Sequence, residues 1–180
     1  TFYPCIDIAP SDDLTHSDAI TQLDRFDWVI ITSANTAYAL SRLQLQVGDV
    51  RIAAVGDTTA AAIREQLRAD VTFTPPQQLA DSLAATLPLN AGERVFLPQS
   101  ARADDSLAVA LRERGAEVTV VDAYQTILGS GGANLPSLLE RDMIDAITFT
   151  SGSTLESLTG RLDRQTPTHV PGRCIGPSTR

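Results

Sequence analysis

Short apolar runs alternate with amphipathic segments along most of the chain. Strands that alternate with helices are typical of a parallel sheet covered on both faces, so the pattern predicts the doubly wound α/β class. Five apolar runs predict β-strands, at residues 28–32, 52–55, 71–73, 95–97 and 118–121. Apolar residues at helical spacing predict helices, on faces formed by Ala60, Ile63 and Leu67, by Leu79, Leu83 and Leu87, and by Leu107 and Leu111.

The predicted helix between the last two strands carries charged residues where helix ends favour them. Asp104 and Asp105 fall in its first turn, where the helix dipole favours negative charge. Arg112 and Arg114 fall in its last turn, and Gly115 follows directly, as expected where a helix ends. The pattern therefore predicts both ends of this helix.

Two turns that follow predicted strands are each present twice. The stretch DWVIITSANTAYAL is echoed by DAITFTSGSTLESL, so that Thr150 lies 118 residues after Thr32. The stretch RIAAVGDTTA is echoed by RCIGPST, and Gly176 lies 120 residues after Gly56. Because both turns repeat in the same order at nearly the same offset, we interpret the chain as carrying a duplicated lobe.

The segments that flank the alternating region predict how two lobes are connected. The N-terminal stretch TFYPCIDIAP is extended, and Tyr124, Thr126 and Leu128 indicate a further short strand. The C-terminal third gives only a helix, a strand, a helix and a strand, too few for a second complete doubly wound sheet. We therefore predict two doubly wound parallel-sheet lobes, the second incomplete in this chain. Their parts are a two-stranded connector (1–9 and 121–127), a complete α/β lobe (10–120) and a partial second α/β lobe (128–180).

Composition and charge narrow the class of protein. The chain is 43% apolar and 20% charged, as in ordinary globular proteins. A net charge of −8 disfavours a general nucleic-acid binder, which needs clustered basic residues. There is no apolar run long enough to span a membrane, no signal peptide and no cysteine pair at metal-binding spacing. These features favour a cytoplasmic protein.

Ligands of an open parallel sheet collect at the carboxyl ends of the strands, where helix N-termini point. The repeated turns lie at such ends and offer backbone N–H groups, hydroxyls and small side chains, which suit anions. Serine and threonine are also ordinary N-cap residues, so a single such turn is more often just a helix cap, and it is the duplication that favours a binding role. The candidate anion-binding residues are Thr32, Ser33, Ala34, Gly56, Thr58, Thr59, Ser151, Gly152, Ser153, Ser178 and Thr179.

A few other residues carry chemistry at this edge. Arg102 follows a predicted strand, where it either binds an anion or is a solvated loop residue. Tyr124 lies on the connector, where its phenol either faces a cleft or packs in the core. His16 and His169 lie in polar surroundings and are expected at the surface. No metal site or Ser/His/Asp arrangement can be assembled from the sequence.

Six motifs in order, IITSANTA, IAAVGDTTA, VFLPQSAR, VDAYQT, ITFTSGST and CIGPST, closely resemble those of the uroporphyrinogen-III synthase family. The resemblance covers the whole chain and implies two α/β lobes joined by a two-stranded ladder. Against the family pattern, we expect this chain to lack an N-terminal strand and helix and a C-terminal segment.

The resemblance implies a reaction without a cofactor or a metal. Members of the family close the linear tetrapyrrole hydroxymethylbilane, with loss of water, to uroporphyrinogen III while inverting the last pyrrole ring. This small-molecule substrate carries eight carboxylates, which the repeated turns would hold largely through backbone N–H donors. We therefore expect a monomeric enzyme of haem biosynthesis, a lyase, with no nucleic-acid or membrane partner.

The resemblance also assigns roles to single residues. Tyr124 matches the connector tyrosine of the family and is the catalytic candidate, assisting departure of the hydroxyl. Gln99 and Ser100 depart from the pattern, since many bacterial members carry a basic residue and a glycine there, and Arg102 is expected to supply the charge. The residues matching the substrate-holding turns are Ser33, Thr59, Ser151 and Thr179.

Two other functions remain open. A non-catalytic two-lobed module, for anion binding or regulation, would keep the same turns without the chemistry. A different enzyme acting on a phosphorylated small molecule is disfavoured, because the chain has neither GxxxxGK[ST] nor GxGxxG after a strand.

Overall fold

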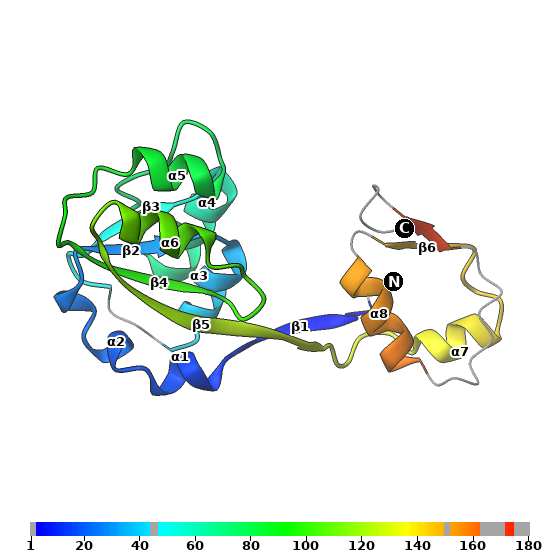
Figure 1. Cartoon of the computed structure of the whole chain (residues 1–180). Coiled ribbons are helices and arrows are strands. Elements are labelled where there is room, and N and C mark those ends of the chain that lie inside the picture. Colours follow the sequence, from blue (N-terminus) through cyan, green and yellow to red (C-terminus); the bar gives the residue numbers. More distant parts are fainter. Residues whose placement is uncertain (1–2, 44–46, 150–151, 163–171, 175–180) are drawn as a thin grey trace. The chain divides into compact units, whose positions relative to one another are not determined.

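The structure is a computed structural model that describes residues 3–43, 47–149, 152–162 and 172–174 (Figure 1). The chain divides into two compact units. One unit is Ile8–Gln125, and the other combines Thr1–Asp7 with Thr126–Arg180. The first unit is therefore an insertion within the second.

The Ile8–Gln125 unit is built on a parallel sheet. Strand β2 (Trp28–Ile31) pairs with β3 (Arg51–Ala54) on one side and with β4 (Arg94–Ser100) on the other. Strand β5 (Glu117–Leu128) lies parallel to β4, and β1 (Ile6–Pro10) lies outside β5. All four side chains of β2 are buried, which requires helices on both faces of the sheet.

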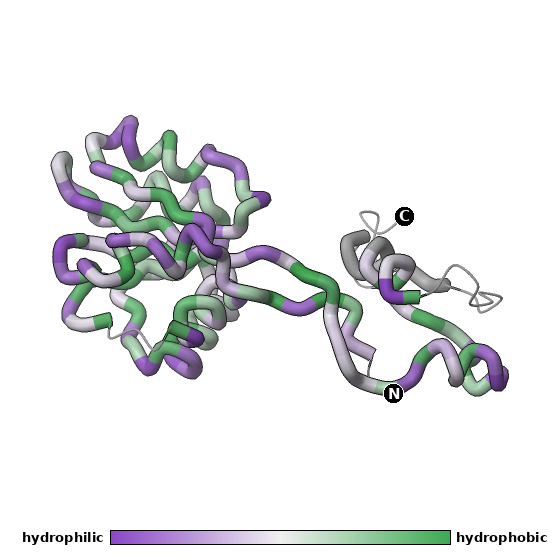
Figure 2. Tube along the Cα trace, turned by 90° about the horizontal axis from the view of Figure 1, so that it is seen from below, coloured by the Kyte–Doolittle hydropathy of each residue, from purple (hydrophilic) through white to green (hydrophobic). Residues whose placement is uncertain are grey.

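Each face of the sheet has its own apolar core, because successive side chains of a strand point to opposite faces. Val29 and Ile31 pack on one side, and Trp28 and Ile30 pack on the other. The central strands are coloured as hydrophobic in Figure 2 and several outer loops as hydrophilic. Helices α1 (Asp12–His16), α2 (Asp18–Thr21), α3 (Ala34–Ser41) and α4 (Asp57–Leu67) supply the first core, and α5 (Ala80–Thr86) and α6 (Ser106–Glu113) the second.

The predicted doubly wound class is therefore confirmed. Three of its helices begin at a serine whose hydroxyl accepts a backbone N–H, which satisfies a donor that a helix start leaves free. Ser11 accepts from Leu14, Ser17 from Ala19 and Ser33 from Thr36. A one-turn 3₁₀ helix, η1 (Leu23–Arg25), follows α2.

Some predicted boundaries are wrong. Of the strand expected at 71–73, only Phe73 forms a bridge, to Ala53, and two prolines follow shortly after it. Leu79 was expected on a buried helix face but is 59% exposed, because α5 begins one residue later. Asp104 and Asp105 both precede α6, with Asp105 at its N-cap, instead of lying in its first turn.

The end of α6 is fixed by two residues that the charge pattern identified. Gly115 follows the helix with φ +89°, in the left-handed region that favours glycine. Arg114 was predicted in the last turn but is the C-cap residue directly after α6. Its guanidinium donates to the carbonyl oxygens of Ala84 and Leu87, at the end of α5. One arginine thus joins the C-terminal ends of both helices on this face.

A polar cluster closes the amino-terminal edge of the sheet. The guanidinium of Arg51 stacks over the Trp28 ring, 4.4 Å from its centroid, and donates to Glu93 Oε1 at 2.7 Å. Glu93 Oε2 accepts from the Trp28 indole at 3.2 Å and from the Asn90 backbone at 3.0 Å. Partial burial raises the pKa of Glu93, but hydrogen bonds from Arg51 and Asn90 outweigh it and lower the pKa to about 2.

The second unit contains helix α7 (Leu135–Glu140), strand β6 (Ile147–Phe149), helix α8 (Gly152–Arg161) and strand β7 (Gly172–Cys174). β6 and β7 are parallel, so the α/β pattern expected for the second lobe is confirmed over the described residues. Its buried core is formed by Leu135, Leu139, Leu158 and Leu162.

Strands β1 and β5 are neighbours in the sheet, and each passes from one unit into the other. The Gly129 N–H donates to the carbonyl oxygen of Cys5, and the Ser11 N–H donates to that of Ala123. Pairing thus runs in opposite chain directions, so β1 and β5 are antiparallel. This pair is the two-stranded connector that the sequence predicts.

Candidate functional site

The strand order defines where a ligand is expected. From β2 the chain passes through α3 to β3 on one side, and the next strand, β4, lies on the other side of β2. Ligands of open α/β sheets bind at the carboxyl ends of strands where the order reverses in this way. The candidate site therefore lies at the carboxyl ends of β2 and β4.

The turn after β2 brings the N-terminus of α3 to this edge. The Ser33 hydroxyl accepts from the Thr36 N–H at 3.2 Å and lies 3.0 Å from Thr36 Oγ1, so Ser33 is an N-cap. Within the described part of the chain, the N–H groups of Ala34 and Asn35 have no acceptor. Thr32 precedes the cap and is half-buried. The turn thus combines a helix cap with two free N–H donors suited to an anion.

Tyr124 lies against this turn. Its phenolic oxygen is 3.5 Å from Ser33 Oγ, and its side chain is only 8% exposed, within the core that contains Ile31 and Ala37. The ring of Tyr124 therefore packs in the core, as one of the two sequence-based interpretations holds, and its hydroxyl reaches the turn after β2.

A β-bulge explains why the tyrosine faces α3. Gln99 of β4 pairs with Asp122 of β5, but Ser100 pairs with Tyr124, so Ala123 is an extra residue in β5. In a regular strand Ala123 and Tyr124 would point to opposite faces, yet both belong to the core on the α3 face. The bulge turns Tyr124 toward Ser33.

The second repeated turn, after β3, is partly occupied by the protein itself. Gln78 Oε1 accepts from the Asp57 N–H at 3.3 Å, and Gln78 Nε2 donates to the Asp57 carboxylate at 2.8 Å. One backbone N–H of this turn is therefore already bonded within the protein. Thr58 is exposed and Thr59 is 5% exposed, and their N–H groups have no acceptor in the described part of the chain.

The backbone at Gly56 approaches Gln78 closely. A Cβ added at Gly56 would lie 2.5 Å from Gln78 Oε1 and 3.0 Å from Gln78 Cβ, so the glycine is needed for this contact. The sequence could have drawn attention to Gln78 only through its place between two prolines and a helix start, a weak signal.

The turn after β4 carries Arg102. Its side chain is exposed, and its backbone N–H donates to Ser100 Oγ at 3.3 Å. Gln99, beside it, is only 5% exposed. Hydrogen bonds from Ser106 hold the pKa of Asp104 below its usual value at the start of α6. Arg102 is thus an exposed cation at the carboxyl end of β4. This position agrees both with anion binding and with a solvated loop residue.

The candidate residues of the second unit are mostly outside the described residues. The residues that the structure does not describe include Ser151, Ser178 and Thr179, and also His169. Gly152 and Ser153 open helix α8, as their sequence pattern predicts. The other histidine, His16, is exposed as expected and bonds to the Asp12 carbonyl.

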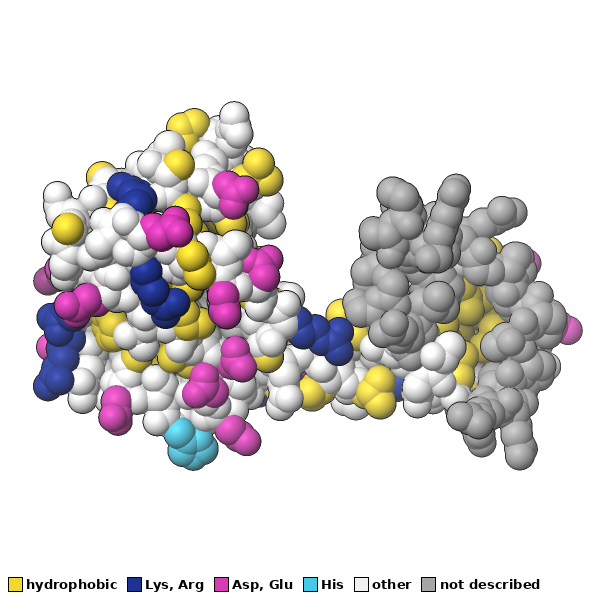
Figure 3. All heavy atoms as spheres, viewed as in Figure 1, with side chains coloured by type: hydrophobic (Ala, Val, Ile, Leu, Met, Phe, Trp, Pro, Cys, Tyr) yellow, Lys and Arg dark blue, Asp and Glu magenta, His cyan; other side chains and the backbone are white. Residues whose placement is uncertain are grey.

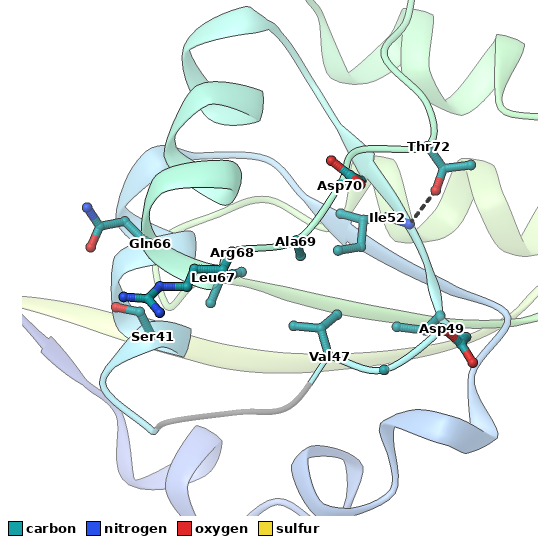
Figure 4. A pocket seen from close by; sticks show the side chains of 12 residues that line it. Ser41, Val47, Asp49, Ile52, Gln66, Leu67, Arg68, Ala69, Asp70 and Thr72 are labelled. Atoms are coloured by element: carbon teal, nitrogen blue, oxygen red, sulfur yellow. Dashed lines mark hydrogen bonds between the residues drawn. The ribbon is translucent and has the colours of Figure 1, made fainter.

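A cavity of about 960 Å³ lies elsewhere in the Ile8–Gln125 unit (Figure 4). It lies between the end of α4 and the start of β3, and is lined by Asp49, Ile52, Arg68 and Asp70 among others. The Ile52 N–H at its wall donates to Thr72 Oγ1 at 3.2 Å. This cavity is at the amino-terminal edge of the sheet, away from the helix N-termini that favour anions.

The described residues offer neither a metal site nor a membrane-spanning helix. No group of three His, Cys, Asp or Glu side chains there could hold a metal ion. No helix in that part of the chain is long and apolar enough to cross a membrane. Acidic and basic side chains are interspersed on the face of the Ile8–Gln125 unit seen in Figure 3.

Comparison with known proteins gives a family for the chain. A family model described as uroporphyrinogen-III synthase HemD matches residues 1–180. The chain belongs to the uroporphyrinogen-III synthase family. The resemblance in the six motifs is therefore confirmed.

Two curated relatives carry the name of the family. The uroporphyrinogen-III synthase of Synechococcus elongatus is 31% identical over 167 residues, which is 86% of this chain and 62% of that protein. The chloroplastic uroporphyrinogen-III synthase of Oryza sativa is 30% identical over 133 residues, 69% of this chain and 44% of that protein. The chain thus spans less than two thirds of either relative.

Solved uroporphyrinogen-III synthases have the same fold. The enzyme from Helicobacter pylori aligns with a TM-score of 0.63 at 16% identity, over 97% of this chain and 76% of that chain. The enzyme from Thermus thermophilus aligns with a TM-score of 0.56 at 22% identity, over 96% of this chain and 72% of that chain. At these identities the likeness concerns the fold, which is two-lobed α/β as the sequence predicts.

Proposed function

We propose that this protein is a uroporphyrinogen-III synthase, a lyase that closes hydroxymethylbilane to uroporphyrinogen III with loss of water and inversion of the last pyrrole ring. The observation that carries the proposal is the family match over residues 1–180, with two curated relatives of that name. The turn after β2 and the buried tyrosine beside it support the proposal, because they combine anion donors with a hydroxyl.

The substrate would be held by its carboxylates. The free N–H groups of Ala34 and Asn35 at the start of α3, and of Thr58 and Thr59 at the start of α4, suit such groups. Each helix N-terminus contributes about 0.3–1 kcal/mol to an exposed anion, so several would have to act together. We propose that Arg102 adds a cation to this set. We also propose that the matching turns at Gly152–Ser153 and at Ser178–Thr179 bind substrate carboxylates.

The chemistry would depend on Tyr124. Its hydroxyl would donate a proton to the leaving hydroxyl of the substrate, so that the carbon–oxygen bond breaks and water departs. For inversion, the methylene carbon that lost the hydroxyl bonds to the α-carbon of the last pyrrole ring that already carries the chain. The bond from that ring carbon to the chain then breaks, and the freed chain methylene bonds to the other α-carbon of the ring, which loses its proton. Ser33, 3.5 Å from the phenolic oxygen, would orient the phenol and help restore its proton. Because unassisted closure gives the isomer without inversion, we expect orientation of the chain to matter more than acid–base catalysis.

The test is an isomer analysis of the full-length protein. Hydroxymethylbilane would be generated in situ, and the products oxidised to porphyrins and separated by chromatography. Predominance of isomer III is the expected result. Isomer I alone, formed at the uncatalysed rate, would overturn the proposal and favour a non-catalytic anion-binding module with the same fold. Cell fractionation with an antibody would test the proposed cytoplasmic location.

A further inference from the structure

The β-bulge that turns Tyr124 leaves backbone groups of β5 that do not pair with β4. Three of these groups are bound by the segment that begins α1. The Ser11 N–H donates to the Ala123 carbonyl at 3.2 Å, and the Ser11 hydroxyl donates to the Asp122 carbonyl. The Asp122 N–H donates to Asp13 Oδ2 at 2.8 Å. Ser11, the N-cap of α1, and Asp13, in its first turn, therefore bind the two residues that precede Tyr124.

The Ser11 hydroxyl is held from both sides. It donates to β5 and at the same time accepts from the Leu14 N–H at 3.0 Å, as the N-cap of α1. Ser11 is 8% exposed, and Leu14 is fully buried in the core that also contains Tyr124. The segment is thus anchored in the same core as the ring, and its bonds to Asp122 and Ala123 have a fixed geometry.

These bonds favour the bulged form of β5 over a regular strand. Successive carbonyl groups of a regular strand point to opposite sides, but those of Asp122 and Ala123 both accept from Ser11. Without the bulge, alternation would place Tyr124 on the face of the sheet opposite to Ser33. The clasp formed by Ser11 and Asp13 therefore selects the face on which the phenol lies.

We propose that Ser11 and Asp13 are positioning residues for Tyr124, which act by holding the bulge at Ala123 and not by contact with the substrate. The inference rests on the proposed catalytic role of Tyr124. Positioning matters because a displacement of about 1 Å at a reacting group can cost about 100-fold in rate. The clasp lies on a helix cap and a strand, the rigid elements on which catalytic groups are best held.

The first test needs no substrate. Tyrosine labelled with ¹³C at Cζ would be incorporated into the full-length protein, and the Tyr124 signal assigned by its loss in Tyr124→Phe. Asp13→Ala and Ser11→Ala should move or broaden this signal and leave the other tyrosine signals in place. Asp13→Asn, which keeps an oxygen acceptor for the Asp122 N–H, should restore the wild-type signal.

Two matched controls separate the clasp from general effects on helix stability. Asp12→Ala removes the neighbouring carboxylate of the same first turn. Ser17→Ala removes the N-cap hydroxyl of α2, which binds Ala19 and not β5. Neither control should move the Tyr124 signal. Equal changes in the controls and in the clasp variants would overturn the proposal, as would an unmoved signal in folded Ser11→Ala and Asp13→Ala.

A measurement on the wild-type protein covers the case in which a variant does not fold. The Asp122 amide should exchange slowly with solvent although its residue is exposed, since Asp13 binds it. Exchange at the rate of a free amide would overturn the clasp.

Activity then connects the clasp to the reaction. Asp13→Ala should lower kcat for isomer III about 10- to 100-fold while KM changes less than about twofold, and Asp13→Asn should recover most of the loss. A wild-type kcat in a variant whose Tyr124 signal has moved would overturn the positioning role. If wild-type protein forms only isomer I, the function proposed above fails, and the signal of Tyr124 alone decides whether the clasp exists.

Discussion

The phenolic oxygen of Tyr124 lies 3.5 Å from the hydroxyl oxygen of Ser33, although 91 positions separate the two residues. The same Ser33 oxygen lies 3.0 Å from Thr36 Oγ1 and caps α3. Three hydroxyl groups thus form a chain from the buried start of a helix to the tip of a buried aromatic ring. We expect a substitution at Ser33 or Thr36 to change the position or hydrogen bonding of the Tyr124 phenol.

Replacing Tyr124 by Phe removes the hydroxyl and keeps the packed ring. We expect kcat for isomer III to fall about 10²- to 10⁴-fold, the usual contribution of a positioned general acid. The free energy of unfolding should fall by about 1 kcal/mol or less, because one neutral hydrogen bond to Ser33 is lost. Isomer chromatography and urea unfolding measure the two effects. Wild-type turnover in this variant would remove Tyr124 from the mechanism.

Replacing Ser33 by Ala removes the cap of α3 together with the neighbour of the phenol. The free energy of unfolding should fall by about 0.5–2 kcal/mol, the usual cost of losing an N-cap. Ser33→Thr keeps a hydroxyl acceptor and should stay close to wild type in urea unfolding. Equal stability of the Ala and Thr variants would show that the hydroxyl does not support the helix.

Glu93 should make stability depend on acidity. Its folded-state pKa of about 2 lies below the ordinary value of 4.5, so the carboxylate stabilises the folded protein above pH 4.5. That contribution is lost as the pH falls toward 2. Glu93→Gln should reduce the free energy of unfolding by about 1.5–3 kcal/mol at pH 7, because charge-assisted hydrogen bonds are replaced.

Urea unfolding of both forms between pH 7 and pH 3 provides the measurement. The difference between wild type and Glu93→Gln should shrink as the pH is lowered. A difference that stays constant over this range would contradict the role of the carboxylate charge.

Gly56→Ala should destabilise the turn after β3. The new Cβ would lie 2.5 Å from Gln78 Oε1, so the amide must move and release the Asp57 N–H. We expect a loss of about 1–3 kcal/mol, as for other overpacked sites. In a Gln78→Ala background the amide is absent, and the same substitution should cost less. A full double-mutant cycle by urea unfolding gives the coupling, and additive effects would argue against this contact.

Much of the fold could be predicted because its determinants are local in the sequence. The run Trp28–Ile31 is apolar at every position, as a strand buried on both faces must be, and Gly115 follows α6 as a glycine stop. Boundaries were harder where two signals competed. Leu79 has the right spacing for a buried helix face, yet the chain enters α5 there and the residue is exposed.

The candidate site depends on contacts that no local pattern reports. Ser33 could be predicted as a cap, but its approach to Tyr124 requires the order of strands and an extra residue in β5. The bulge at Ala123 has no glycine or proline to mark it in the sequence. Its partners Ser11 and Asp13 are more than a hundred residues earlier and look like an ordinary helix start.

The insertion of Ile8–Gln125 within the other unit has a consequence for the order of folding. The inserted unit can complete its sheet and both cores while the later part of the chain is still being synthesised. The bond between Gly129 and Cys5, in contrast, must close a loop that contains the entire inserted unit, with a cost in chain entropy. The bond between Ser11 and Ala123 already closes most of this loop, so little further chain entropy is lost when Gly129 binds Cys5. We therefore expect the inserted unit to fold first and the outer unit to fold after it, although the outer unit contains the first residues of the chain.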